Sequence, residues 1–128
     1  MTNRRKQLME MQAMTRRNKY GNRKTTVDGY EFASKAEALR YQELKLMVYA
    51  GEISLLRLQP RYVLQDAFML DGKRVRAVEY IADFEYFDNT TKAVIIEDVK
   101  GVETAVFRLK HKLFQKRYSR SIRIIPVR

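Results

Sequence analysis

The stretch AVIIEDVKG, Ala93 to Gly101, sets the architecture of the chain. Residues 93–96 are apolar in both alternating sets, which is typical of a central strand covered on both faces. The charged residues Glu97, Asp98 and Lys100 follow almost directly. Because residues two apart in a strand share a face, Asp98 and Lys100 point to one side and Glu97 to the other. A carboxylate and an ammonium therefore lie side by side at the end of a buried strand.

Two further strands are predicted upstream, joined to residues 93–100 by short turns. Residues 62–69 and 75–87 favour strands, and their connectors contain Asp71-Gly72 and Asp88-Asn89-Thr90-Thr91, which favour tight turns. The three segments are expected to form an antiparallel meander, whose middle strand is long enough to contain a bulge. One face of that strand is predicted to lie in the core, with Val78, Tyr80, Ala82, Phe84 and Tyr86.

A helix is predicted before the meander, between a hairpin and a glycine stop. Asp28-Gly29 favours a type I′ hairpin turn. Ser34 is suited to be the N-cap, Glu37 stands at the capping-box position, and Gly51 ends the helix. Glu37 also heads an apolar stripe that must pack on the sheet. The stripe comprises Tyr41, Leu44 and Val48.

A second helix and a last strand complete the predicted fold. Residues 103–117 have helical periodicity, and residues 121–126 form a strand that a right-handed crossover places parallel to residues 93–100. The apolar stripe of this helix comprises Val106, Leu109 and Leu113, flanked by Phe107 and Phe114. The predicted order over residues 27–128 is αβββαβ, in a single domain of the α/β (α+β) class. Its mixed central sheet is flanked by helices.

The turn at residues 88–91 is expected to bring Asp83 beside Asp98. If the chain reverses direction near residue 90, each residue of one strand pairs with the residue of the other strand whose number brings the sum of the two to about 181. Two carboxylates directly opposite repel each other, and a hard divalent cation removes that repulsion. Mg²⁺ is the usual ion where a few oxygen ligands are completed by water. Glu37 offers a third carboxylate, because an acid on the buried side of a helix needs a partner.

The order of these residues resembles the PD-(D/E)XK nuclease superfamily. That motif has a helical Glu, a strand Asp, and then an acid, any residue and Lys on the next strand, matched here by Glu37, Asp83, Asp98 and Lys100. The phrases SKAEALRYQEL, GEISLLRLQP, YIADFEY and EDVKG look like a small phage-encoded branch, long filed as a domain of unknown function, over residues 19–128. Ala82 stands where the motif has Pro, and Asp98 where Glu is commoner. Glu97 is therefore an alternative motif acid, and strand alternation favours Asp98 because it shares a side with Lys100.

The resemblance implies a restriction-endonuclease-like core and Mg²⁺-dependent hydrolysis of a phosphodiester, with Mn²⁺ able to substitute. Asp83 and Asp98 would hold the metal, and Glu37 a metal-bound water or a second ion. Lys100 would orient the attacking water or stabilise the transition state. Gln59 would support the site. Similarity to phage resolvases implies branched DNA such as a Holliday junction, in recombination, replication or packaging, and a homodimer that cuts two strands symmetrically.

The charge of the chain points independently to a polyanionic partner. The formal net charge is +11, and residues 1–26 hold eight Lys and Arg residues against Glu10 alone, which leaves +7 in a predicted basic arm that is helical in part. DNA is the leading partner, and the cations expected to position it are Arg16, Arg17, Arg74, Arg76, Arg108, Lys110 and Lys112. The chain has no cysteine and no apolar run of membrane-spanning length, so we expect a cytoplasmic protein without a membrane partner.

Two other function classes remain open from the sequence. A non-catalytic nucleic-acid-binding protein would account for the charge but has no use for carboxylates on its phosphate-facing side. A membrane-surface protein would act through residues 1–26. Simpler roles also exist for the single residues: Glu37 as a capping residue only, Asp83 as a solvated residue on an exposed sheet face, and Asp98 with Lys100 as a surface ion pair worth under about 1 kcal/mol.

Overall fold

The structure is a computed structural model that describes residues 23–127. The predicted basic arm therefore lies outside the described residues as far as residue 22, and with it Arg16 and Arg17. The chain divides into two compact units, Met1–Glu43 and Leu44–Arg128, and each is described by itself. The described part contains two helices and ten strands. Within it, no helix is both long and apolar enough to cross a membrane.

The first unit contains a hairpin and the beginning of helix α2. Strands β1 (Thr25–Val27) and β2 (Tyr30–Phe32) pair antiparallel through Asp28-Gly29, both of which have positive φ as a type I′ turn requires. Tyr41 donates a hydrogen bond from its hydroxyl to Asp28 Oδ2 (3.0 Å), and its ring packs against Phe32. These contacts fix the hairpin on the helix.

Helix α2 (Lys35–Tyr49) begins and ends as its sequence predicts. The Glu37 backbone N–H donates to Ser34 Oγ (3.1 Å), which is the N-cap bond. At the other end, in the second unit, Gly51 has a φ of +77° and its N–H bonds the carbonyl of Val48, which closes the last turn.

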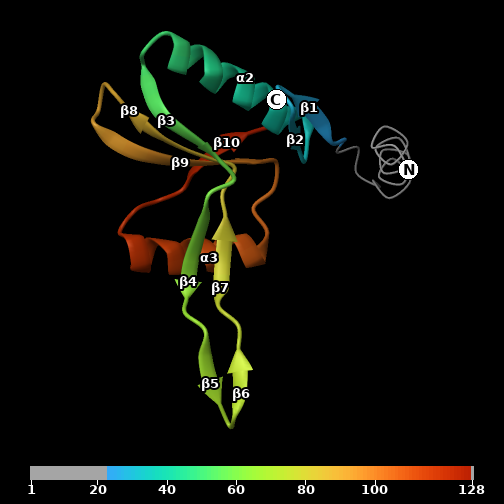
Figure 1. Cartoon of the computed structure of the whole chain (residues 1–128), viewed down its shortest axis with the longest axis vertical. Coiled ribbons are helices and arrows are strands. Elements are labelled where there is room, and N and C mark those ends of the chain that lie inside the picture. The colour runs from blue at the N-terminus through green and yellow to red at the C-terminus, as the bar shows by residue number, and fades with distance from the viewer. Residues whose placement is uncertain (1–22, 128) are drawn as a thin grey trace. The chain divides into compact units, whose positions relative to one another are not determined.

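The second unit is built on a mixed four-stranded sheet in the order β10-β9-β8-β3 (Figure 1). Its strands are β3 (Ile53–Leu58), β8 (Phe84–Asp88), β9 (Ala93–Lys100) and β10 (Arg123–Pro126). β8 pairs antiparallel with both β3 and β9, whereas β9 and β10 are parallel and connected by α3 (Ala105–Tyr118). The predicted parallel last strand and the central position of β9 are confirmed. The fold is mixed α+β, as predicted.

A two-stranded ribbon is inserted between β3 and β8. β4 (Arg61–Gln65) pairs with β7 (Val78–Ile81), and β5 (Phe68–Leu70) pairs with β6 (Lys73–Val75) through Asp71-Gly72. Figure 1 shows the β5–β6 end of this ribbon projecting away from the four-stranded sheet. The predicted meander is therefore wrong in one respect: its first strand, residues 62–69, pairs outside the central sheet. The sheet takes Ile53–Leu58 as its first strand instead, so the order αβββαβ holds with a ribbon inserted.

The predicted middle strand, residues 75–87, is also wrong as a single strand, because it is interrupted at residues 76–77 and again at Ala82 and Asp83. Tyr80, before the break, bonds Asp98, whereas Tyr86, after it, bonds Glu97. Since Glu97 and Asp98 point to opposite faces of β9, the break moves the apolar side chains from one face of the sheet to the other. The five residues predicted for one core face are thus divided between two faces.

Helix α3 buries a different side from the one its sequence stripe predicts. Phe107 and Phe114 are buried, while Val106, Leu109 and Leu113 are exposed. The two rings pack in a core with side chains of the ribbon and the sheet, among them Leu64, Tyr80, Ala82, Ile96 and Ile122. An aromatic ring removes more apolar surface from water than Val or Leu, so this orientation is the more favourable one. The N-cap of α3 is Thr104, whose hydroxyl accepts from the Phe107 N–H.

Candidate active site

The pairing of β8 and β9 places two carboxylates at the same level of the sheet. Phe84 pairs with Glu97 and Asp88 with Ala93, so Asp83 and Asp98 are the residues directly beyond the last pair at this end of the ladder. The residue numbers in each of these pairs sum to 181, which confirms the predicted register. Asp88 fixes this register by holding the turn. Its Oδ1 accepts the backbone N–H groups of Thr90 and Thr91, and these bonds lower the pKa of the Asp88 carboxyl.

Backbone hydrogen bonds hold Asp83 at the end of the ladder. Its N–H donates to the Glu97 carbonyl (3.1 Å), and its Oδ2 accepts the N–H of Val99 (2.7 Å). Val99 lies between Asp98 and Lys100 in the chain, so the Asp83 carboxylate is bound to the backbone segment that carries both. The strand break at Asp83 frees its side chain from a regular ladder position and allows this bond.

Asp98 and Lys100 lie together on the α3 side of β9. Lys100 Nζ is 3.3 Å from Asp98 Oδ2 and 4.4 Å from the centre of the Phe107 ring. The Asp98 carboxylate is almost wholly buried and also accepts a hydrogen bond from the Tyr80 hydroxyl. Phe107 therefore positions the ammonium by a cation–π contact, and Tyr80 positions the carboxylate.

The negative charge of this centre affects the pKa of Tyr80. Burial raises the pKa of its hydroxyl far above the ordinary value, and the hydrogen bond to Asp98 together with the charges of Asp98 and Asp83 raises it further. Tyr80 thus remains a hydrogen-bond donor to Asp98 at neutral pH. Both carboxylates act on one tyrosine, which agrees with their placement on one side of the sheet.

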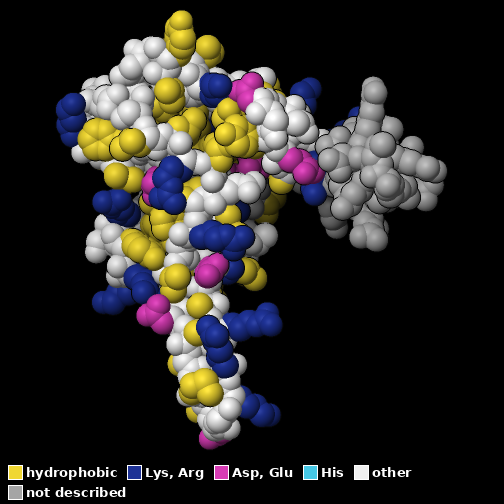
Figure 2. All heavy atoms as spheres, viewed as in Figure 1, with side chains coloured by type: hydrophobic (Ala, Val, Ile, Leu, Met, Phe, Trp, Pro, Cys, Tyr) yellow, Lys and Arg dark blue, Asp and Glu magenta, His cyan; other side chains and the backbone are white. Residues whose placement is uncertain are grey.

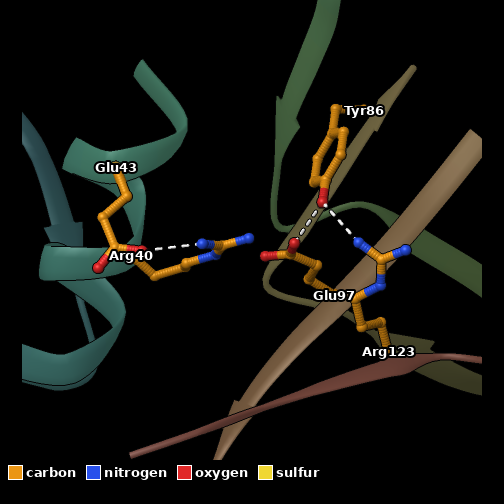
Figure 3. Close-up of polar contacts among 5 residues, drawn as sticks. All are labelled: Arg40, Glu43, Tyr86, Glu97 and Arg123. Atoms are coloured by element: carbon orange, nitrogen blue, oxygen red, sulfur yellow. Dashed lines mark hydrogen bonds and ion pairs between the residues drawn. The ribbon is translucent and has the colours of Figure 1, made fainter. Parts of the chain in front are cut away.

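Glu97 lies on the opposite face of β9 in a separate polar network. Its side chain is fully buried and accepts a hydrogen bond from the hydroxyl of Tyr86 on β8. Arg123 on β10 donates from Nη1 to the same hydroxyl (3.4 Å), so the three residues connect three adjacent strands (Figure 3). On α2, Arg40 and Glu43 form an ion pair of 2.8 Å (Figure 3). The structure therefore groups Asp98, and not Glu97, with Lys100.

Asp83 and Asp98 are the candidate metal ligands. Within residues 23–127, no three His, Asp or Glu side chains are arranged so that they could hold a metal ion. A pair of carboxylates nevertheless suits Mg²⁺, which is commonly bound through one or two carboxylates with substrate phosphates and water in the other positions. The donor set is made only of hard oxygen atoms, and it lies at the edge of the buried core. These residues fit a Mg²⁺ site.

The other predicted residues lie in several places. Glu37 belongs to the first unit, and its side chain is buried. That it holds a metal-bound water or a second ion together with Asp83 and Asp98 stays a prediction. Gln59 is exposed and contributes its backbone: its N–H donates to the Asp83 carbonyl (2.9 Å), from a φ of +50°. Lys110 Nζ donates to the Glu79 carbonyl (2.9 Å). The remaining predicted cations that the structure describes are exposed, namely Arg74, Arg76, Arg108 and Lys112.

Two aromatic residues of the site are absent from the predicted set. Tyr80 is predicted only as a core residue, and Phe107 only as a flank of a helical stripe. Their spacing in the sequence carries no signal for contact with Asp98 and Lys100, because both contacts depend on the strand break and on the rotation of α3. Only the break itself had a local signal, in the length of residues 75–87.

Comparison with known proteins identifies a family without assigning an activity. Residues 17–126 match the profile of a family described as "Protein of unknown function (DUF1064)". No curated protein and no solved structure matches the chain. The match spans both compact units, including the strand ends that carry Asp83, Asp98 and Lys100.

Proposed function

The chain belongs to the DUF1064 family, whose description assigns no activity, and we propose from its site that it is a metal-dependent DNA endonuclease of the PD-(D/E)XK type. The observation that carries the proposal is the bond from the Val99 N–H to the Asp83 carboxylate. It ties Asp83 to the backbone between Asp98 and Lys100, so that two acids and one ammonium lie at one point of the sheet.

Each residue of this centre has a chemical task. Asp83 and Asp98 would hold Mg²⁺ or Mn²⁺, which supplies Lewis-acid stabilisation of the charge on the phosphate when bound. Lys100 donates a hydrogen bond to the attacking water or to a phosphate oxygen. Tyr80 and the Val99 N–H hold the two carboxylates in place. Water adds to phosphorus and the bond to the leaving sugar oxygen breaks, which gives a phosphomonoester and a hydroxyl end.

Charge outside the centre supports DNA as the substrate. Arg108 and Lys112 are exposed on α3, the helix that also provides Phe107 beneath Lys100. Cations beside a phosphodiester-cleaving centre bind the backbone of the substrate without selecting its sequence. We favour branched DNA, cut by a homodimer in the cytoplasm during phage DNA metabolism. The branched substrate, the dimer and the phage context rest on the resemblance to phage resolvases.

Cleavage of a labelled four-way junction and of a matched linear duplex tests the proposal. The wild-type protein is expected to cut with Mg²⁺ and not with EDTA, and Asp98→Asn and Lys100→Ala are each expected to lose at least about 100-fold in rate. Lys92→Asn is the matched control, because Lys92 is an exposed cation with a φ of +61° that Asn tolerates. The ratio of rates on the two substrates tests the preference for branched DNA.

Glu37→Gln adds an arm that separates the two roles of Glu37. The cap bond uses the backbone N–H of Glu37, so this variant keeps the cap and removes only the carboxylate charge. Lost cleavage with an unchanged melting temperature would assign Glu37 to the chemistry, and retained cleavage would leave it as a capping residue.

A non-catalytic DNA-binding protein is the alternative. It would bind all of these DNAs equally with Mg²⁺ or EDTA and would cut none of them. That result, with intact binding by Asp98→Asn and Lys100→Ala, would replace the nuclease proposal.

A further inference from the structure

Three large apolar side chains are exposed in succession at the end of the β5–β6 ribbon. Phe68, Met69 and Leu70 have 43%, 64% and 58% of their surface accessible. A projecting two-stranded ribbon has no core of its own to bury such residues, and it is marginally stable without a partner. Exposed apolar residues gathered in this way mark a surface that another molecule covers.

The opposite strand of the ribbon provides cations. Lys73 and Arg74 on β6 and Arg76 directly after it are all exposed, and within residues 23–127 none of them forms an ion pair. Figure 2 shows Lys and Arg side chains along this ribbon with apolar side chains between them. The acid Asp66 at its base is already paired with Arg117 (3.2 Å). Asp71 in the turn is the remaining acid of the ribbon against these three cations, so the charges available to a partner are predominantly positive.

The strand register sorts these side chains onto two faces. Phe68 pairs with Val75 and Leu70 with Lys73, so these four share one face, which is mainly apolar. Met69 pairs with Arg74 on the other face. The ribbon thus presents an apolar face and a face with an Arg, and it ends in the tight turn at Asp71-Gly72.

We propose that the β5–β6 ribbon is a DNA-binding wedge, in which Arg74 and Arg76 contact phosphates while Leu70 and Phe68 enter the base stack. A two-stranded ribbon fits the major groove, which is about 12 Å wide. Apolar side chains such as Phe, Leu and Met are able to enter between base steps and unstack them. The inference rests on the proposed function for the identity of the substrate and adds the element that recognises its branch point.

Branched DNA is the form that this wedge favours. Unstacking a base step in a continuous duplex costs free energy. At a junction the stacking is already interrupted, so an apolar tip gains contact without most of that cost. The wedge therefore supplies a physical reason for a preference that otherwise rests on resemblance alone.

A second copy of the chain is a less suitable occupant. Two ribbons packed by their apolar faces would bury the Lys73 ammonium of each copy in an apolar interface, and burying a charge disfavours association. DNA offers phosphates for the cations and base faces for the apolar tip. Charge complementarity thus selects the nucleic acid.

The test measures binding in EDTA, where no cleavage takes place, with a four-way junction that carries 2-aminopurine beside its branch point. The wild-type protein is expected to raise the fluorescence on binding, because an unstacked 2-aminopurine emits more strongly. Phe68→Ser with Leu70→Ser is expected to lose most of this rise. Leu46→Ser is the matched control, since Leu46 is equally apolar and 72% exposed.

A second pair of variants tests the cations. Arg74→Ala with Arg76→Ala is expected to weaken binding and to reduce the slope of log affinity against log salt by about 2, because each arginine that no longer neutralises a phosphate lowers the slope by about 1. Lys92→Asn is the control. The melting temperatures of all variants are expected to match that of the wild type, because every substituted residue is exposed.

Two results would overturn the inference. Fluorescence and salt slope equal to those of the controls would show that the ribbon does not contact DNA. A wild-type dimer that becomes a monomer in Phe68→Ser with Leu70→Ser, with DNA binding unchanged, would assign the ribbon to self-association. Because the test needs no cleavage, it separates the two proposals. If the ribbon variants lose the fluorescence rise but the wild-type protein cuts no DNA, only the nuclease proposal is rejected. If the wild-type protein cuts DNA but the ribbon variants bind it as the controls do, only the wedge proposal is rejected.

Discussion

Glu97 and Asp98 are neighbouring acids on β9 that serve opposite faces of the sheet, each held by a different tyrosine. Glu97 accepts a hydrogen bond from the Tyr86 hydroxyl, which itself accepts one from Arg123, so these three residues link three adjacent strands. Asp98 binds Tyr80 and Lys100 beside Asp83. We infer that the first acid stabilises the sheet and the second carries the chemistry.

Removing one charge from each acid separates these roles. Glu97→Gln is expected to lower the free energy of unfolding by about 1–3 kcal/mol, because a fully buried polar network loses its charged acceptor. Asp98→Asn is expected to stay within about 1 kcal/mol of wild type in EDTA, since the lost attraction of Lys100 is offset by the lost repulsion of Asp83. Urea unfolding measures both. A larger loss in Asp98→Asn than in Glu97→Gln would contradict the assignment.

The raised pKa of Tyr62 predicts how the stability of the fold changes at alkaline pH. Burial raises its pKa above the ordinary value near 10, and its hydrogen bond to Glu85 (2.6 Å) raises it further. The folded protein therefore keeps this proton at a pH where the unfolded chain loses it, so stability falls as the pH rises above about 10.

Tyr62→Phe is expected to lose about 1 kcal/mol at neutral pH with its hydrogen bond, and to show a smaller fall in stability between about pH 9 and 11. Tyr49→Phe, at an exposed position, is the control and is expected to behave as wild type. An alkaline fall of the same size in both variants would refute the role of Tyr62.

At the scale of elements, helix α3 shows why an apolar stripe does not by itself identify a buried face. Its sequence offers two stripes at helical spacing, one with Val106, Leu109 and Leu113 and one with Phe107 and Phe114. Nothing local distinguishes them. The choice depends on the sheet and ribbon that the helix covers, and there the two phenylalanines contact Tyr62, Tyr80 and Lys100.

Truncation at the two stripes checks this orientation. Phe114→Ala is expected to destabilise the fold by about 3–5 kcal/mol, because it leaves a cavity beside Tyr62 and Tyr118. Leu109→Ala, on the exposed stripe, is expected to change stability by no more than about 0.5 kcal/mol. Thermal or urea unfolding gives both values, and a reversed order would mean that α3 packs by its other side.

Strand β3 shows a second limit of prediction from sequence. Its residues ISLLRL do not alternate, and the pairing with β8 shifts register between Ser54 and Arg57, where Leu55 has a φ of +56°. An irregularity of this kind removes the period of two that identifies a strand. In the same way, the break at Asp83 divides one predicted strand and moves Phe84 and Tyr86 to the other face.

At the scale of the whole molecule, the centre of the site is predictable because few residues determine it. The turn at Asp88 fixes the register of β8 and β9, and strand alternation then groups Asp98 with Lys100. The supporting residues are not predictable in this way. Tyr80 and Phe107 reach the site through a strand break and a helix rotation, which depend on the packing of the whole second unit.

The net charge of +11 is also a property of the whole molecule. It raises the rate at which the protein meets any polyanion, but it does not distinguish a nuclease from a binding protein. The distinction rests on Asp83 and Asp98, because a protein that only binds phosphate gains nothing from two acids beside its cations.

Titration of the protein with Mn²⁺, with bound ion measured by calorimetry, tests this central claim most directly. The wild-type protein is expected to bind Mn²⁺, and Asp83→Asn and Asp98→Asn are each expected to lose at least about tenfold in affinity. Glu85→Gln is the matched control, since Glu85 lies on β8 next to the centre and is engaged by Arg57 and Tyr62. Equal Mn²⁺ binding by all four proteins would show that Asp83 and Asp98 hold no metal, and would contradict the account.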